Sequence, residues 1–121
     1  MIGYKVVNDK YKSVIMDILS KTYTLEYIVG TTVMALPHTL GVFFFKELED
    51  AMYFTNPGNI ILAIEVPESA NPRSRKFAYH HYIVENDYFH RCHPDFETPI
   101  GTWTADFVTV VKEISSKEYL P

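Results

Sequence analysis

The stretch that decides the fold is GVFFFKELEDAMYFTNPGNIILAIEV, residues 41–66. It opens with an apolar and aromatic run typical of a buried strand and closes with a second such run. Between the two, residues 46–55 predict a short helix, because apolar and small side chains recur at the spacing of one helical face. These side chains are Leu48, Ala51, Met52 and Thr55. The helix is expected to end at NPGN, since proline cannot continue it and glycine allows a positive φ.

The sequence on both sides of this unit predicts further strands separated by proline-containing loops. The predicted strands are 3–8, 23–30, 75–85 and 103–114. The predicted loops are 34–41, 67–74 and 93–102. The stretch 11–19 fits either a helix or a strand. We therefore expect an α+β fold, with one domain over residues 1–114 and a polar tail at 115–121. Its sheet would be mostly antiparallel or mixed, with roughly six to eight strands and one short helix at 46–55.

The composition excludes several classes of protein. The chain has 121 residues, a net charge of −4 and a pI near 5.7, which argues against a binder of nucleic-acid phosphates. Its single cysteine excludes an internal disulfide and fits a reducing compartment. We find no apolar run long enough for a membrane span and no basic-then-apolar leader. We expect an intracellular protein.

The stretch HHYIVENDYFHRCHP, residues 80–94, holds four of the five histidines and the only cysteine. If Asn86-Asp87 forms a two-residue turn, His81, His90 and Cys92 share one face of a strand pair and can hold a zinc-like ion. A slip of one residue separates them. If the turn is longer, they are ordinary strand residues, and we expect the longer turn.

The stretch PRSRK, residues 72–76, is the one local concentration of positive charge that we identify. Arg73, Arg75 and Lys76 can contact phosphate groups, or they can lie in a solvated loop beside an acidic surface. We expect the solvated loop. The chain contains no glycine-rich phosphate loop, no nucleophile elbow and no kinase motif, so we expect no catalytic residues and no cofactor.

Three segments resemble a group of small uncharacterised domains encoded by bacteriophages and large DNA viruses. The group is characterised by a Y-x-[VI]-G step, a glycine-initiated aromatic strand followed by a helix, and an apolar strand that ends in proline. The matching residues are 27–30, 41–51 and 60–67, and the resemblance spans roughly residues 3–85. It implies a shared fold and a location in a host cytoplasm or in association with a virion, and it gives no activity.

The order of elements also resembles, more distantly, that of ADP-ribosyltransferase domains. Those domains carry a histidine on the first strand and a tyrosine on the aromatic strand. Here the corresponding residues are Tyr4-Lys5-Val6 and Phe43-Phe44-Phe45, with neither group present. The resemblance implies a nucleotide-like ligand, with Arg73 and Arg75 on its phosphates. Its base would stack on Phe44, Tyr79 or Tyr82.

These patterns lead us to expect a non-enzymatic viral accessory or structural protein that binds another protein or assembles with itself. Nine tyrosines and eight phenylalanines supply aromatic anchors for such contacts. A first alternative is a binder of a nucleotide-derived small molecule that sequesters a host-defence signal. A second is a divergent enzyme of the ADP-ribosyltransferase type.

Overall fold

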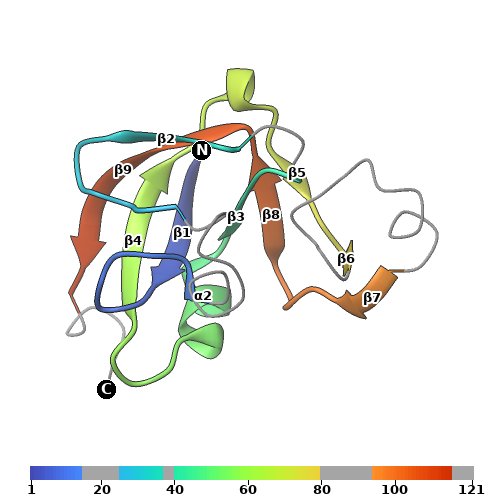
Figure 1. Cartoon of the computed structure of the whole chain (residues 1–121), viewed down its shortest axis with the longest axis horizontal. Helices are drawn as coiled ribbons and strands as arrows, with labels where there is room; N and C mark the ends of the chain where they lie inside the picture. Colours follow the sequence, from blue (N-terminus) through green and yellow to red (C-terminus); the bar gives the residue numbers. More distant parts are fainter. Residues whose placement is uncertain (15–24, 37–39, 80–93, 116–121) are drawn as a thin grey trace.

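A computed structural model of the chain describes residues 1–14, 25–36, 40–79 and 94–115, and for 77–79 and 94–97 it describes the backbone alone. Seven strands form one antiparallel sheet in the order β2-β9-β4-β1-β3-β8-β5 (Figure 1). In chain order they are β1 (Ile2–Val7), β2 (Thr32–Met34), β3 (Val42–Phe45), β4 (Ile60–Glu65), β5 (Arg73–Ser74), β8 (Thr102–Ala105) and β9 (Phe107–Ile114). A separate two-stranded sheet pairs β6 (Phe77–Tyr79) with β7 (Pro94–Glu97). The helical elements of the described residues are α2 (Leu48–Phe54) and a 3-10 turn, η2 (Glu68–Ala70). The α+β fold with an antiparallel sheet is confirmed.

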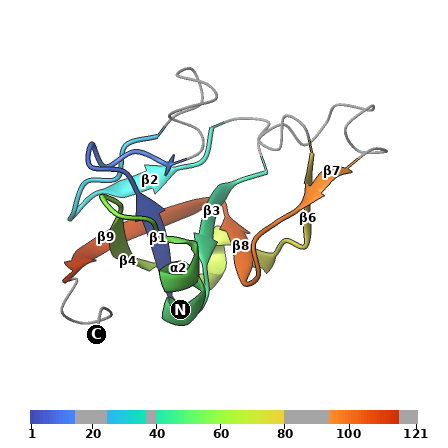
Figure 2. The ribbon, with the colours of Figure 1, turned by 90° about the horizontal axis from the view of Figure 1, so that it is seen from below.

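The main sheet is apolar on both faces, and each face carries its own core. Successive residues of a strand point to opposite faces, so Val6 and Val7 belong to different cores. The larger core lies on the face that Val7 joins, together with Leu62, Ile64, Val108 and Val110. The smaller core is covered by α2, whose Ala51 is fully buried against Val6, Phe45 and Ile61. We call the face with the larger core the larger-core face and the face covered by α2 the helix face. Figure 2 shows α2 under β1 and β3.

Two parts of the sheet meet along a short contact between β1 and β3. The register of that contact is the single pair Tyr4–Phe45, whereas β1 and β4 pair from Ile2 to Val7. We call this contact the seam. On one side of it lie β2, β9, β4 and β1, and on the other lie β3, β8 and β5.

The predicted strand–helix–turn–strand unit at 41–66 is present. The helix begins at Leu48 and ends at Phe54, so it is shorter at both ends than the predicted 46–55. Glu47 and Thr55 have extended backbones, and the amide of Thr55 donates to Ala51 O at 3.0 Å. Asn59 N donates to Asn56 O and closes the predicted turn before β4.

The prediction of a strand at 23–30 is wrong for the residues that the structure describes. Glu26 forms only an isolated bridge with Lys12. The chain then turns at Gly30, whose φ of +89° favours glycine, and Thr31 N donates to Ile28 O. The strand begins after this turn as β2, which ends at Met34, inside the predicted loop 34–41.

The single strand predicted at 103–114 is two strands. Asp106 separates β8 from β9 because its backbone groups form hydrogen bonds with two other segments. Its N–H donates to Ala70 O, and its carbonyl accepts from Ala35 N. β8 then pairs with β3 and β5, and β9 pairs with β2 and β4. The predicted loops 67–74 and 93–102 also contain regular structure, namely η2, β5 and β7.

β9 contains a bulge opposite β4. The register moves from Ala63–Lys112 to Ile64–Val110, which leaves Val111 as an extra residue. Beyond the bulge the two faces of β9 exchange, so Val110 enters the larger core and Ile114 enters the smaller one.

Candidate functional site

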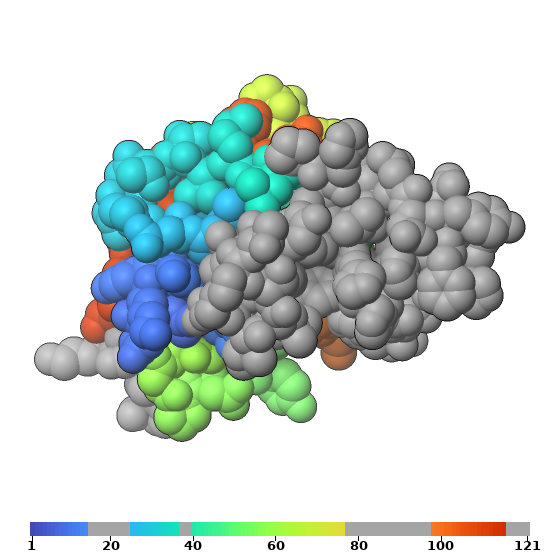
Figure 3. All heavy atoms as spheres, viewed as in Figure 1, coloured from blue at the N-terminus to red at the C-terminus, as the bar shows by residue number. Residues whose placement is uncertain are grey.

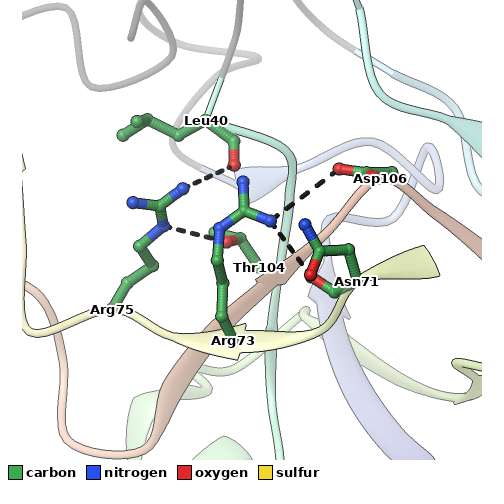
Figure 4. A network of polar contacts seen from close by, with 6 residues as sticks. All are labelled: Leu40, Asn71, Arg73, Arg75, Thr104 and Asp106. Carbon is green, nitrogen blue, oxygen red and sulfur yellow. Dashed lines mark hydrogen bonds and ion pairs between the residues drawn. The ribbon is translucent and has the colours of Figure 1, made fainter. Parts of the chain in front are cut away.

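Arg75 is held in place by both its backbone and its guanidinium group. Its amide donates to Thr102 O at 2.9 Å, and its carbonyl accepts from the Thr98 hydroxyl. Its Nε donates to Thr104 Oγ1 at 2.9 Å, and one terminal nitrogen donates to Leu40 O at 3.3 Å (Figure 4). Arg75 therefore ties the loop before β3 to β8, which is a structural role.

Arg73 is less constrained. Its Nη1 donates to Asn71 O at 3.1 Å and lies 4.0 Å from an oxygen of Asp106. The two side chains are 35% and 55% exposed, so solvent weakens this ion pair. Alternate residues of a strand share a face, and Figure 4 shows both guanidinium groups over β8.

Of the other predicted ligand residues, the structure describes the side chains of Phe44 and Lys76. Phe44 is 2% exposed in the larger core, so its ring has no free face on which a base could stack. Lys76 is exposed. For Tyr79 the structure describes only the backbone, in β6, and Tyr82 lies outside the described residues.

The predicted metal ligands His81, His90 and Cys92 also lie outside the described residues, as does the turn Asn86-Asp87. Both the conditional metal site and the longer turn that we expect in its place therefore stay predictions.

A buried lysine lies beside the seam. Lys5 is 6% exposed, and its Nζ donates to Phe43 O at 2.7 Å. The same ammonium group lies 5.2 Å from the centre of the buried Tyr27 ring. Because side chains alternate along a strand, Lys5 lies on the larger-core face with Gly3 and Val7. Lys5 thus links β1 to β3 one residue beyond the pair Tyr4–Phe45.

Burial changes the acid–base chemistry of this residue. It lowers the pKa of the Lys5 ammonium group from 10.5 to about 7, because an apolar surrounding disfavours the charged form. Burial also raises the pKa of the Tyr27 hydroxyl above its ordinary value. The signal for Lys5 was visible in the strand 3–8, where alternation places a lysine among residues that face a core.

The outer edge of β2 carries backbone groups that point away from the sheet. Val110 N donates to Thr31 O, and Ala35 N donates to Asp106 O, so Thr31 and Ala35 bond inward to β9. Bonding alternates along an antiparallel strand, so Val33 also faces β9 while Thr32 and Met34 direct their N–H and C=O groups outward. No described strand pairs with this edge.

The side chains around this edge are exposed and uncharged. Met34 is 60% exposed, and Ile28 and Val29 are each about half exposed. The nine residues from Ile28 to Leu36 contain no charged side chain. Figure 3 shows residues 25–36 at the molecular surface, at the upper left. We call residues 28–36 with the outer side of β2 the β2 edge. Sequence reasoning missed it, although the long uncharged run was a usable signal.

The opposite edge of the sheet is different. β5 has only two residues, follows Pro72 and carries Arg73. A short strand flanked by proline and bearing a charge resists the addition of another strand. The two edges of the main sheet are therefore not equivalent.

Comparison with known proteins identifies no relative: no family model, curated protein or solved structure matches this chain. In the part of the chain that the structure describes, no helix has the length and apolar character that crossing a bilayer requires.

Proposed function

We propose that this protein acts by binding another polypeptide, which adds a strand to the β2 edge. The observation that carries the proposal is the set of outward N–H and C=O groups of Thr32 and Met34, beside exposed apolar side chains. An unpaired strand edge is a template for another chain, and natural sheets usually protect it with charge or proline. The β2 strand has neither, while β5 carries Arg73 and directly follows Pro72.

The resemblance to phage and viral domains supports a narrower form of this proposal, in which the protein is a viral accessory or structural component. Binding through a sheet edge needs no catalytic group, so it agrees with the lack of a catalytic motif in the sequence.

A photoreactive amino acid placed at Met34 tests the proposal in cells that produce the protein. We expect an adduct of defined mass after illumination, because the exposed side chain at position 34 lies beside the added strand. The matched control places the same amino acid at Ser74, which is exposed on the opposite edge. Equal adducts at both positions, or none at position 34, would contradict the proposal.

A second candidate function is the binding of a phosphate-bearing small molecule at Arg73. Arg73 of β5 and Arg75, directly after that strand, place their guanidinium groups near each other, and that of Arg73 is partly exposed with one long ion pair. Arg75 would then orient the site while remaining bound to Thr104 and Leu40.

Thermal unfolding in the presence of ADP-ribose, adenine nucleotides and inorganic phosphate tests this second candidate. We expect a rise in Tm at millimolar ligand that is lost in Arg73→Ala. No rise for the unaltered protein would exclude the candidate.

A further inference from the structure

We infer that the polypeptide bound at the β2 edge is a second copy of this chain, paired antiparallel with its own β2 about a two-fold axis through Val33. This inference rests on the proposed function and names its partner. It follows from the backbone register, the distribution of charge and the difference between the two sheet edges.

The register follows from which backbone groups point outward. Thr32 and Met34 each offer one N–H and one C=O on the outer side of β2. In an antiparallel pair with the axis at Val33, Thr32 stands opposite Met34 of the second copy, and the reverse pair forms at the same time. Each pair exchanges two hydrogen bonds, so the four outward backbone groups of each copy are all hydrogen-bonded in the dimer. An axis at Thr32 or at Met34 leaves half of them unpaired.

The side chains agree with this register. Val33 is buried in the larger core, so Thr32 and Met34 point to the helix face. On that face α2 packs against residues of β1, β3 and β4, whereas Met34 is exposed. In the pair, each Met34 packs beside Thr32 of the second copy.

Charge favours contact at this edge over contact elsewhere. Each copy has a net charge of −4, which opposes association of two identical molecules. Residues 28–36 carry no charge, so the copies meet where neither presents one.

The two edges determine that the assembly closes. Pairing β2 with β2 is isologous, because each copy uses the same surface. The β5 edge has Pro72 and Arg73 and does not continue the sheet. The product is a dimer with a continuous sheet across the axis, and it does not grow into a filament.

The size of the edge sets the strength of the dimer. Stable interfaces bury about 1,200–2,000 Å² in total, and a three-residue strand with its flanking residues supplies less. We therefore expect a reversible dimer with a dissociation constant on the order of 10–100 µM.

Sedimentation velocity of the purified chain, from about 10 µM to about 1 mM, measures this association. We expect the monomer to give way to a dimer over that range. Met34→Lys should raise the dissociation constant at least about tenfold, because edge lysines block strand addition. The control Val111→Lys also places a lysine at an exposed apolar position of the sheet, but on β9, which is not an edge strand. It should leave the constant within about twofold.

A register test uses single cysteines in a Cys92→Ser background. Thr32→Cys and Met34→Cys should form an interchain disulfide when mixed and mildly oxidised, because residues 32 and 34 stand opposite each other across the axis. Each variant on its own should form little interchain disulfide. If either variant alone forms as much interchain disulfide as the mixture does, the proposed register is wrong.

The outcomes separate this inference from the proposed function. A chain that stays monomeric at about 1 mM overturns the dimer. If a monomeric chain still gives an adduct at position 34 and mass spectrometry identifies a different protein, the proposed function stands with a foreign strand as partner. A monomer with no adduct at position 34 overturns both.

Discussion

At Lys5, burial and charge act against each other. The folded chain holds the amine in an apolar surrounding against Tyr27, where its Nζ donates to Phe43 O. The unfolded chain exposes the same amine to water. The protonated form is therefore favoured in the unfolded state, and proton binding opposes folding.

The stability of the protein should depend on pH through this residue. The pKa of Lys5 is about 7 in the folded chain and 10.5 in the unfolded one, so the unfolded state binds more protons between these values. The free energy of unfolding should therefore rise with pH in that window, by at most about 1.4 kcal/mol per pH unit. Below about pH 7 Lys5 is protonated in both states, so it should add no pH dependence there.

Urea denaturation between about pH 7 and pH 9 measures this slope. The range ends below the ordinary tyrosine pKa of 10.0, because the raised pKa of the Tyr27 hydroxyl reduces stability as pH rises through that value. Lys5→Met keeps the apolar stem and removes the proton, so its slope should be absent. An equal slope in both proteins would mean that another group is responsible.

The two arginines should differ in their effect on stability. Arg75→Ala removes the hydrogen bonds to Leu40 O and to the buried Thr104 hydroxyl, which should cost about 1–3 kcal/mol. Arg73→Ala removes one bond to an exposed carbonyl and a long ion pair, so its cost should stay within about 0.5 kcal/mol. Equal losses in chemical denaturation would show that Arg73 also has a structural role.

At the scale of an element, β3 depends on the glycine that precedes it. Gly41 has a φ of +120°, and a Cβ at this position would lie 2.8 Å from Ala105 O, a backbone atom of the paired strand β8. Gly58 has a φ of +89° with open space around it. Both glycines relieve backbone strain, but only Gly41 also prevents a clash.

The matched pair Gly41→Ala and Gly58→Ala separates these effects. Gly58→Ala should cost about 1–2 kcal/mol from the positive φ alone. Gly41→Ala should cost at least about 1 kcal/mol more, because β8 must shift away from β3. Thermal or chemical unfolding of both variants measures the difference, and equal costs would mean that β8 moves freely.

The elements that the sequence predicted are those whose pattern is local. The unit 41–66 has a helical period between two apolar runs, and both the runs and the period survive in the fold. β2 was misplaced because the alternation at 23–30 predicts a strand that ends at Gly30, whereas the backbone turns at Gly30 and the strand begins after it. β8 and β9 were merged because Asp106 breaks the strand through bonds to Ala70 and Ala35, which are distant in sequence.

The candidate sites were predictable to different degrees for the same reason. Composition located Arg73 and Arg75, but their separate roles depend on acceptors at Leu40, Thr104 and Asn71. That β2 lies at the edge of the sheet follows from the strand order, which a local sequence pattern does not predict. Phe44 was assigned to stacking because a run of three phenylalanines does not reveal which rings face the core.

At the scale of the whole molecule, the seam divides the sheet into parts of unequal stability. β4 is paired along its length on both sides, by β1 and β9. The part formed by β3, β8 and β5 is joined to it by the pair Tyr4–Phe45, by Lys5 and by α2. We expect this smaller part to open before the rest.

Native-state hydrogen exchange tests this order of opening. Amides of β4 should exchange only through global unfolding, whereas those of β8 should exchange with a free energy lower by at least about 1 kcal/mol. Lys5→Met should widen the gap, because it removes the bond across the seam. A single free energy for β4 and β8 would show that the sheet opens as one unit.

The bulge at Val111 gives this sheet a position at which the chain can change in length. Elsewhere in β9, loss of one residue would turn every later side chain to the opposite face. Without Val111, Val110 would still pair with Ile64 and Lys112 with Ala63, now in a regular ladder. The chain can therefore lose one residue here and keep both cores intact, so natural variants that are one residue shorter are expected to carry the gap at this position.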